Sequence, residues 1–598
     1  MAIHWIHLGN SAGTGDGSSS GNAASAFASV TIADGDTVYV KGQSRGVPVT
    51  ITQDGVTVRP WPDTPASQRP WLRGDIQITS GNWTDETDGT FSATLATKPN
   101  AVFWNIATNI DANGRHFGHL DESGSLASCQ ATEGTWYHQS GTLYVHPATA
   151  DGAADPDNGD DYSYTVTGQN GLEMSGDNAT CKGLRSSFWT TNASAQGYGF
   201  YMRGDNPTIE DLRADDCGYH GIGLVTAAKT KARAYRCSVW GAADTQWVIH
   251  TQTGELNDVK LYECSAHMYS RLGTDGQPLG EDEFEGFYTH GASGEDTVRD
   301  IELHRFRWIG YGGYNGSLAS GDNIIRATDY DDPETYSVRC YDCEAVGVGK
   351  LTLGGAPDCE FAFIRSKLDF TDSLTGAEQP TDSAIRLHTG TSLGLFACSI
   401  TSFADYTDTD TMLQMVGSCR VTIANSALFL NGTNVACSFF DSSVWNSIGR
   451  LNVYGTVFVA PTATGAELFK IHNGQLITAL DGGTLIQFEG CWYDGITAFD
   501  GRALNNYDTP AEWQAGVDAT GVYDEPAGFI RIGDRYELDP AGNASSRIRE
   551  ASDRPSVTIT QGINKRNYDG RVGPLQGGES SDPVRITALL GLGSSILV

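Results

Sequence analysis

Short runs in which apolar and polar residues alternate recur between about residue 170 and residue 500. Alternation with a period of two predicts β-strands, and the Gly, Asn and Asp residues between the runs predict turns. One set of runs ends in Gly or a small polar residue and comprises 199–204, 221–227, 246–251, 286–291, 323–329, 350–355, 384–390, 412–417 and 468–474. A second set follows after turn-rich segments and comprises 209–217, 232–240, 259–267, 301–309, 336–346, 393–401, 419–429 and 450–459. The pattern predicts two or three short strands in each repeat.

The spacing of the first set indicates the architecture. We take as equivalent positions Phe200, Ile222, Trp247, Phe287, Ile325, Leu351, Ile385, Leu413 and Phe469. Successive gaps are 22, 25, 40, 38, 26, 34, 28 and 56 residues, and the last gap covers two repeats with 436–441 as the weaker one between. Such a period without helical periodicity predicts a β-solenoid whose coils stack inward residues into ladders, one of them formed by cysteines. A β-sandwich is the alternative, but it would not repeat with this variable length.

Charge and composition exclude several classes of partner. The 598 residues include 39 Lys and Arg against 73 Asp and Glu, so the formal net charge is −34. Nucleic acid and anionic membrane surfaces are therefore poor partners, because both need Lys and Arg. We read no signal peptide and no apolar run of about 18 residues, so we expect no membrane insertion.

The twelve cysteines lie mostly inside apolar alternations, which favours free, buried thiols in a protein made in a reducing cytoplasm. Cys340 and Cys343 have the C-x-x-C spacing of a zinc site but lack a second such pair. We expect no cofactor, although the acidic turns 15–21 and 155–161 leave a structural calcium ion open. His116 and His119 are a weak candidate pair for a metal.

Three segments carry a resemblance to a known family. The opening stretch 6–42 resembles the start of right-handed parallel β-helix proteins of the pectate-lyase-like superfamily. The segment WYHQSGTLYVHPATADGAADP (136–156) is similar to one found before the helix in many carbohydrate-active members, and GINKRNYDGRVGPLQGGE (562–579) is similar to a closing segment. The resemblance implies a right-handed parallel β-helix with an N-terminal cap and a small C-terminal closing segment. This fold hosts lyases, hydrolases, isomerases, tailspikes and adhesins, so it does not fix an activity.

We expect five segments along the chain. They are capping strands and a first coil (1–60), a β-rich insertion (61–165), the β-helix coils (166–505), a closing segment (506–580) and a tail (581–598). The tail ends in the uncharged stretch ITALLGLGSSILV (586–598), which is too short to span a bilayer and suits a contact with another subunit or with a virion.

Alternation also predicts which side chains of the first set of runs face outward. With Phe200 and Met202 inward, the outward positions form a stripe rich in Arg, Lys and His, which we expect to hold no carboxylate. We interpret the stripe as a carbohydrate groove, since Arg and His donors hold acidic or hydroxylated sugar groups. The candidate substrate-binding residues are Arg203, His250, Lys350, Arg386, His388, Lys470 and His472. A register shift of one residue would reverse every assignment.

Acidic turns lie beside this face, and two kinds of catalysis remain open. A paired-carboxylate glycosidase would use an acid and a base from the turns. A β-eliminating lyase would neutralise a uronate with Arg or Lys and take a proton with His, Lys or Tyr. The candidate catalytic residues are Tyr288, His290, Arg326, Asp329 and Asp331. The resemblance supplies no catalytic residue, because the motifs of polygalacturonases and the calcium site of pectate lyases are missing.

These features favour a bacteriophage virion protein of the tailspike or tail-fibre type that binds a host surface polysaccharide. The resemblance implies a homotrimer that contacts other tail or virion proteins, assembled in the host cytoplasm and located in the phage tail. Three alternatives remain: the same protein with depolymerase activity, a cellular polysaccharide lyase or glycoside hydrolase, and a purely structural virion protein. Whether the protein is an enzyme is left open.

Overall fold

The computed structural model describes residues 1–153, 155–156, 160–165, 169–189, 197–226, 231–251, 255–269, 272–275, 285–291, 297–311, 323–327, 335–353, 359–370, 383–403, 411–431, 438–445, 449–460, 466–470, 486–499, 509–523, 525–532 and 535–538. The chain forms two compact units. The first comprises Met1–Thr289, Tyr311–Asp322 and Leu374–Glu378, and the second comprises His290–Gly310, Asn323–Ser373 and Gln379–Val598.

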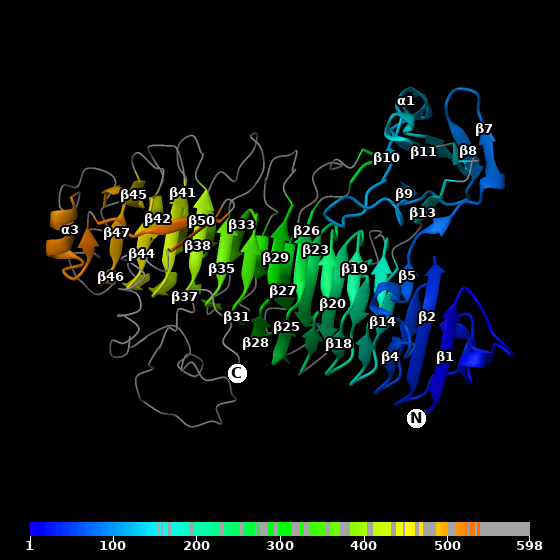
Figure 1. Cartoon of the computed structure of the whole chain (residues 1–598), viewed down its shortest axis with the longest axis horizontal. Helices are drawn as coiled ribbons and strands as arrows, with labels where there is room; N and C mark the ends of the chain where they lie inside the picture. The colour runs from blue at the N-terminus through cyan, green and yellow to red at the C-terminus, as the bar shows by residue number, and fades with distance from the viewer. Residues whose placement is uncertain are drawn as a thin grey trace. The chain divides into compact units, whose positions relative to one another are not determined.

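Parallel strands of successive coils form three sheets in the first unit, which we name A, B and C (Figure 1). Sheet A holds β1 (Ile3–Leu8), β2 (Thr37–Arg45), β4 (Thr57–Pro60), β15 (Thr180–Lys182), β18 (Thr208–Glu210), β21 (Arg233–Tyr235), the short β24 (Glu255–Leu256) and β25 (Val259–Tyr262). Sheet B holds the end of β2, β5 (Trp71–Arg73), β16 (Arg185–Ser187), β19 (Arg213–Asp215), β22 (Ser238–Trp240) and β26 (Ser265–Met268). Sheet C holds β3 (Val49–Ile51), β14 (Leu172–Met174), β17 (Phe200–Met202), β20 (His220–Thr226), β23 (Thr245–Thr251) and β27 (Glu285–Gly291).

The second unit repeats this order of strands. Its sheet A holds β28 (Thr297–His304), β31 (Thr335–Tyr341), β34 (Glu360–Ile364), β37 (Ser392–Phe396), β40 (Arg420–Ala424), β43 (Arg450–Tyr454) and β46 (Ile486–Glu489). Its sheet B holds β29 (Arg307–Gly310), β32 (Glu344–Val346), β35 (Lys367–Phe370), β38 (Ser399–Phe403), β41 (Ala427–Asn431), β44 (Val457–Val459), β47 (Trp492–Asp494) and β49 (Val522–Tyr523). Its sheet C holds β30 (Asn323–Ala327), β33 (Lys350–Leu353), β36 (Ser383–Leu387), β39 (Thr411–Gly417), β42 (Ser438–Trp445), β45 (Ala466–Lys470) and β48 (Ile496–Ala498).

The predicted register of sheet C is confirmed where pairings are described. Phe200 pairs with Ile222 and Ile222 with Trp247, while in the second unit Leu351 pairs with Ile385 and Ile385 with Leu413. The weak repeat at 436–441 is the start of β42, which lies between β39 and β45. The predicted all-β parallel β-helix is therefore confirmed.

The turn from sheet A to sheet B contains one residue with a left-handed backbone. These residues are Gly183, Asp211, Arg236, Glu263, Arg305, Asp342, Arg365, Ala397, Asn425, Gly455 and Gly490. Within each unit the N–H of such a residue donates to a carbonyl of the next coil at nine of these positions, as from Arg236 to Tyr262 and from Arg365 to Phe396, both at 2.8 Å. Each coil is thereby fixed to its successor at the same point of the turn.

The residue after this turn position is often a small, buried donor. The donors are Cys237, Cys264, Cys343, Ser366, Cys398, Ser426, Thr456 and Cys491. The Cys398 Sγ lies 3.4 Å from the Phe396 carbonyl, and the Ser426 Oγ lies 3.0 Å from the Ala424 carbonyl. The predicted cysteine ladder is confirmed for Cys237, Cys264, Cys343 and Cys398, whereas Cys217, Cys340 and Cys419 lie at other positions of the coil. Hydroxyl residues share the ladder because each donor satisfies a buried carbonyl. Cys340 and Cys343 are free and buried in the core.

Aspartates form a second ladder in the first unit, on the turns from sheet C to sheet A. The Asp177 N–H donates to Asp54 Oδ1 and the Asp205 N–H donates to Asp177 Oδ1, both at 2.8 Å. Asp54 makes the same contact with Asp34 at 3.0 Å. The sequence D-[GN]-x-T at 34–37, 54–57, 177–180 and 205–208 marks these turns, and the Gly or Asn adopts a left-handed backbone.

A β-rich insertion interrupts the first unit between β5 and β14 (Figure 1). Its elements are β6 (Ile76–Gln77), β7 (Trp83–Asp85), β8 (Phe91–Thr94), β9 (Ala101–Trp104), β10 (Asp121–Glu122), α1 (Leu126–Ala131), β11 (Thr135–Gln139), β12 (Thr142–His146) and β13 (Tyr162–Thr165). Its own core includes Trp104, Trp136 and Tyr162. Phe103 and Ile106 pack against Phe188, which follows the sheet B strand β16, so the insertion has an apolar contact with the coils.

Buried ion pairs lie at this contact. Asp215, fully buried on β19, accepts from Arg185 at 2.7 Å and from Arg213 at 2.6 Å. Burial alone would raise the pKa of Asp215, but the two guanidinium groups hold it well below its usual range. His116 of the insertion contacts Arg185, and burial lowers the pKa of His116 to about 4.

A matching pair of arginines surrounds Asp75, which follows β5. The Nη2 atoms of Arg45 and Arg73 both lie 2.6 Å from Asp75 Oδ2, and Arg45 also reaches Asp161 of the insertion at 3.0 Å. Asp75 is fully buried. Removing one partner of such a network leaves a buried charge without compensation, so the network holds the insertion in one position.

The metal interpretation of His116 and His119 is wrong. His116 Nδ1 lies 2.6 Å from the Ile106 carbonyl, and the His119 ring packs edge-on against Phe103 at 4.9 Å. Within the described ranges, no group of three His, Cys, Asp or Glu side chains has the arrangement of a metal site.

The helix α3 (Pro510–Gly516) closes the second unit behind its last coil. Trp513 of α3 is fully buried against Phe469, Phe488 and Phe499, and its Nε1–H donates to the Tyr493 hydroxyl at 3.1 Å. The hairpin of β50 (Phe529–Ile532) and β51 (Arg535–Leu538) follows, and Phe529 contacts Phe429 of sheet B.

Asp518 replaces the missing next coil. Its Oδ1 and Oδ2 accept the N–H groups of Gly490 and Cys491, each at 3.0 Å. In the preceding coil the same position, Gly455, donates to the Glu489 carbonyl instead.

The Asp518→Asn variant should destabilise the end of the second unit by about 1–3 kcal/mol, because an amide nitrogen then faces a backbone N–H. Hydrogen exchange at Gly490 and Cys491 measures the loss directly. The exposed Glu489→Gln variant of the same coil is the matched control. Equal exchange in both variants would contradict the role of Asp518.

Acidification should destabilise the contact between the insertion and the coils. His116 binds a proton in the unfolded chain near its ordinary pKa of 6.5 but in the folded protein only near 4. The free energy of unfolding is therefore highest above the pKa of His116 in the unfolded chain. It falls by about 3 kcal/mol in total as the pH decreases to the pKa of His116 in the folded protein. Urea-unfolding midpoints between about pH 7 and about pH 4 measure this loss. If the unfolding midpoint of a His116→Asn variant fell with decreasing pH as steeply as that of the unaltered protein, the role of His116 would be refuted.

Candidate functional site

The outer face of sheet C in the first unit presents three rows of side chains. The row nearest sheet B comprises Asn170, Tyr198, His220, Thr245 and Glu285. The middle row comprises Glu173, Tyr201, Gly223, Val248 and Tyr288. The third row includes Arg203, Val225 and His250. Parallel pairing sets neighbouring members about 4.8 Å apart, so adjacent coils can act on one ligand.

An apolar cluster covers the centre of this face. Tyr198 stacks on Tyr201 with ring centroids 4.3 Å apart, and both pack on Val225 and Val248. Gly223 makes room for this stack, since a Cβ there would lie 2.4 Å from Tyr198 Cε1. Tyr201 is 9% exposed and Val248 is 3% exposed. Both residues face outward, as two-residue alternation from Phe200 and Met202 predicts, but the cluster buries them, so this part of the face is not an open groove.

Four titratable side chains gather at the start of β20, β23 and β27. The Tyr219 hydroxyl is hydrogen-bonded to Asp244, and His220 Nδ1 lies 3.5 Å from Asp244 Oδ2. Glu285 is 2% exposed and accepts from the Thr245 hydroxyl at 3.1 Å. The Glu285 N–H donates to the Asp244 carbonyl at 2.9 Å, so the two acidic residues belong to adjacent strands. We call Tyr219, His220, Asp244 and Glu285 the acidic cluster.

The environment keeps Tyr219 protonated. Burial raises its pKa, and the negative charges of Asp244 and Glu285 raise it further. Tyr219 is therefore a hydrogen-bond donor at neutral pH, while Asp244, with 27% of its side chain exposed, can meet a ligand. A carboxylate, an imidazole and a protonated phenol in contact are the groups that general acid–base catalysis uses.

The predicted binding residues of the first unit lie on the third row. Arg203 pairs with Glu173 at 3.2 Å and places its guanidinium 5.5 Å from the Tyr201 ring. His250 is half-buried on β23, in register with Val225. Tyr288, a predicted catalytic residue, is half-buried on the middle row.

The second unit has a polar row of its own. Arg386 of β36 pairs in register with Gln414, and Gln414 with Asp441, whose Oδ2 accepts from Gln414 Nε2 at 3.4 Å. His388 follows β36, and burial together with Arg386 lowers its pKa. The expectation that the stripe holds no carboxylate is wrong, because Asp441 here and Glu173 in the first unit occupy equivalent positions. Each sits beside a donor, which satisfies its charge.

Several predicted residues stay predictions. Asp329, Asp331 and His472 lie outside the described residues. For His290, Arg326, Lys350 and Lys470 the strand is described but the side chain is not. The backbone of β30 and β33 does place Arg326 in register with Thr352. The expected grouping of Tyr288, His290 and Arg326 with the acids at 329 and 331 is thus untested.

Sequence reasoning missed most of the acidic cluster. Tyr219 and Asp244 directly precede β20 and β23, and His220 is the first residue of β20, so these residues lie where alternation is only beginning and gives no signal. Glu285 belongs to the acidic stretch 281–285 before Tyr288, which in the sequence is indistinguishable from the other acidic turns. The available signal was a titratable residue directly before, or at the first position of, each of three consecutive sheet C strands.

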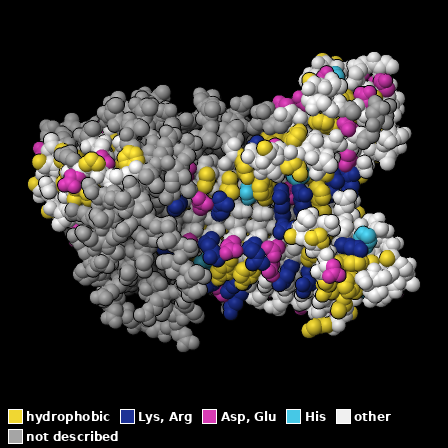
Figure 2. Space-filling view, viewed as in Figure 1, with side chains coloured by type: hydrophobic (Ala, Val, Ile, Leu, Met, Phe, Trp, Pro, Cys, Tyr) yellow, Lys and Arg dark blue, Asp and Glu magenta, His cyan; other side chains and the backbone are white. Residues whose placement is uncertain are grey.

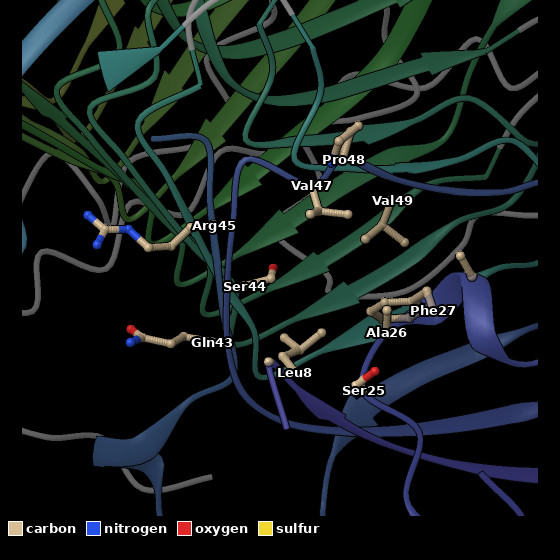
Figure 3. Close-up of a pocket in the computed structure, with 12 residues that line it drawn as sticks. Leu8, Ser25, Ala26, Phe27, Gln43, Ser44, Arg45, Val47, Pro48 and Val49 are labelled. Carbon is tan, nitrogen blue, oxygen red and sulfur yellow. The ribbon is translucent and has the colours of Figure 1, made fainter. Parts of the chain in front are cut away.

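A cavity of about 570 Å³ lies elsewhere, at the N-terminal end of the first unit (Figure 3). Leu8, Phe27, Val47 and Val49 line it, and Figure 3 shows these side chains around the opening. Its charged residue, Arg45, is held by Asp75 and Asp161. Ser25, Gln43 and Ser44 also line the cavity, but in the described chain it lacks a carboxylate or imidazole for acid–base chemistry, so we do not assign the function to it.

Comparison with known proteins yields fold resemblances. No protein-family model and no curated protein matches the chain. One similar structure, described as XylC with xylose, has 10% identity over 79% of this chain and 86% of its own, with a TM-score of 0.44. A mannuronic acid specific family 6 polysaccharide lyase from human gut microbiota has 10% identity over 92% and 94%, with a TM-score of 0.39. The tailspike gp49 of Pseudomonas phage LKA1 has 11% identity over 79% and 72%, with a TM-score of 0.27.

These values transfer neither an activity nor a catalytic residue to the chain. In the part of the chain that the structure describes, no helix is long and apolar enough to cross a bilayer.

Proposed function

We propose that the protein binds a cell-surface polysaccharide along the outer face of sheet C and cleaves it at the acidic cluster. The observation that carries the proposal is the position of Asp244, which is held by Tyr219 and lies beside His220, next to the buried Glu285. Such a cluster has no evident role in coil stacking, which the backbone ladders already provide.

The rows of sheet C suit an extended ligand. A polysaccharide presents the same groups at a regular interval, and a parallel sheet presents side chains at about 4.8 Å from coil to coil. Arg203 and His250 offer donors on the third row, on the same face as the acidic cluster. Donors in line with a catalytic group can hold successive sugars while one bond is cut.

The chemistry favours hydrolysis over elimination. Two carboxylates on adjacent strands resemble the acid and base that glycosidases use. Elimination requires a cation to neutralise the uronate. The cation described on this face, Arg203, is already paired with Glu173. Tyr219 stays protonated and can donate to the departing oxygen.

The Asp244→Asn variant should lower the cleavage rate at least about 100-fold, since it removes a general acid or base. Purified protein is incubated with bacterial capsule, lipopolysaccharide and alginate, and released reducing ends are measured. The exposed Asp63→Asn variant is the matched control and should keep full activity. Products that absorb as unsaturated uronates would refute hydrolysis, and full activity of Asp244→Asn would refute the site.

A virion location and a homotrimer follow from the family resemblance and stay predictions. Light scattering should give a particle of three times the chain mass of 64.0 kDa. Labelled antibody should mark the tail of purified phage particles. A stable monomer would contradict the tailspike interpretation while leaving the glycan site untouched.

A further inference from the structure

Aromatic and cationic side chains gather on the outer face of sheet A, at its first three strands. Trp5 of β1 and Tyr39 of β2 are half-buried there, and so is Trp61, which follows β4. His7, Lys41 and Arg59 lie among them. We call these six residues the aromatic–cation patch. In Figure 2, cationic, histidine and apolar side chains lie side by side over these N-terminal strands, at the right of the view.

Strand register builds the patch. Trp5 pairs with Tyr39 and Tyr39 with Arg59, while His7 pairs with Lys41. The Trp5 and Tyr39 rings stack at 4.7 Å, and Trp61 stands at 88° to Trp5 at 5.2 Å. The Trp61 Nε1–H donates to the Ile6 carbonyl at 3.0 Å, which fixes the ring to the edge strand. The rings therefore form a preformed wall that loses little entropy when it binds a ligand.

The cations of the patch are not neutralised. Lys41 Nζ lies 3.6 Å from the Trp61 ring centroid, and the Arg59 guanidinium lies 5.6 Å from that of Tyr39. Neither forms an ion pair with any carboxylate of the described chain. Elsewhere on sheet A, Lys182 pairs with Glu210 at 2.7 Å and Arg233 pairs with Asp258 at 2.7 Å. In a chain of net charge −34, two cations that contact only aromatic rings are available to an anion from outside.

We propose that the aromatic–cation patch is a second binding site, which takes an acidic sugar unit of a polysaccharide. The aromatic wall packs on the apolar C–H groups of the pyranose ring, and Lys41 and Arg59 pair with its carboxylate. This site is separate from the acidic cluster, since it lies on another sheet, and it would bind without cleaving. It holds a polymer on the protein while the proposed catalytic face acts elsewhere on the same chain.

Ring geometry favours a sugar over a nucleobase. The facing sides of Trp5 and Tyr39 cover each other, and Lys41 covers Trp61, so a planar base cannot insert between these rings. A pyranose can pack its C–H groups on the accessible parts of the half-buried rings, with a cation beside it. Burial and Lys41 lower the pKa of His7, so the imidazole stays neutral and serves as a hydrogen-bond group.

Native gels that contain polygalacturonate or alginate test the proposal, because binding retards the protein in proportion to affinity. The Lys41→Gln/Arg59→Gln variant should bind these uronate polymers at least about fivefold more weakly than the unaltered protein, and added salt should weaken binding of the latter. The Lys182→Gln variant is the matched control, since it removes a cation of the same sheet that Glu210 already neutralises. Its affinity should not change.

Further outcomes would overturn the proposal. The first is that neither uronate polymer retards the unaltered protein. The second is that the Lys182→Gln variant loses as much affinity as the Lys41→Gln/Arg59→Gln variant. The third is that neutral dextran or duplex DNA retards the protein as strongly as the uronate polymers do. Thermal unfolding of the Lys41→Gln/Arg59→Gln variant, matched to the unaltered protein, separates lost binding from lost folding. Trp61→Phe keeps the ring and should retain most of the affinity. The contribution of Lys41 and Arg59 to binding should persist when the Asp244→Asn substitution is added to both proteins, so failure of the cleavage proposal and failure of this one are distinguishable.

Discussion

One hydrogen bond per coil governs the architecture: the N–H of the left-handed turn residue between sheets A and B donates to the following coil. It fixes the phase of each coil, so the strands on all three sheets fall into register. Because the partner is a carbonyl of the next coil wherever the bond is described before the last coil, each coil depends on its neighbour for stability. The end therefore needs a substitute, and Asp518 supplies two carboxylate oxygens where the carbonyl of a further coil would lie.

The same stacking decides where charges can lie. Equivalent side chains of adjacent coils are about 4.8 Å apart, so like charges in one row repel each other. Opposite charges of adjacent coils pair at some positions, as in Arg365 with Asp342 and Arg307 with Glu344. Where like charges stack, as in Arg185 with Arg213, both contact a carboxylate, here that of Asp215. In the aspartate ladder a backbone N–H of the next coil offsets each carboxylate instead.

The two-residue period of the sequence predicted the strands and their inward rows, but it missed the residues whose positions the period does not determine. Two-residue alternation placed Phe200, Ile222 and Trp247 in one inward row, and the structure pairs them so. Alternation predicts on which side of the sheet a side chain lies, but not whether neighbouring side chains bury it. It therefore could not predict that the tyrosine stack buries Val248. Asp244 directly precedes β23 and Glu285 begins β27, and the folded coil brings these two residues together although they are 41 residues apart in the sequence.

The net charge counts all charged residues equally, although they differ in whether they are available to bind an external ligand. Arg203 and Arg185 add to the count of cations, yet each already contacts a carboxylate of its own chain. Lys41 and Arg59 add no more to that count, but their contacts are aromatic rings, so an external anion meets no competitor there. An acidic protein can thus recognise an acidic polymer at a few positions, while its overall charge repels the polymer elsewhere. The repulsion by the rest of the protein favours one alignment of the polymer, because it is offset only where an anionic group of the polymer contacts Lys41 and Arg59.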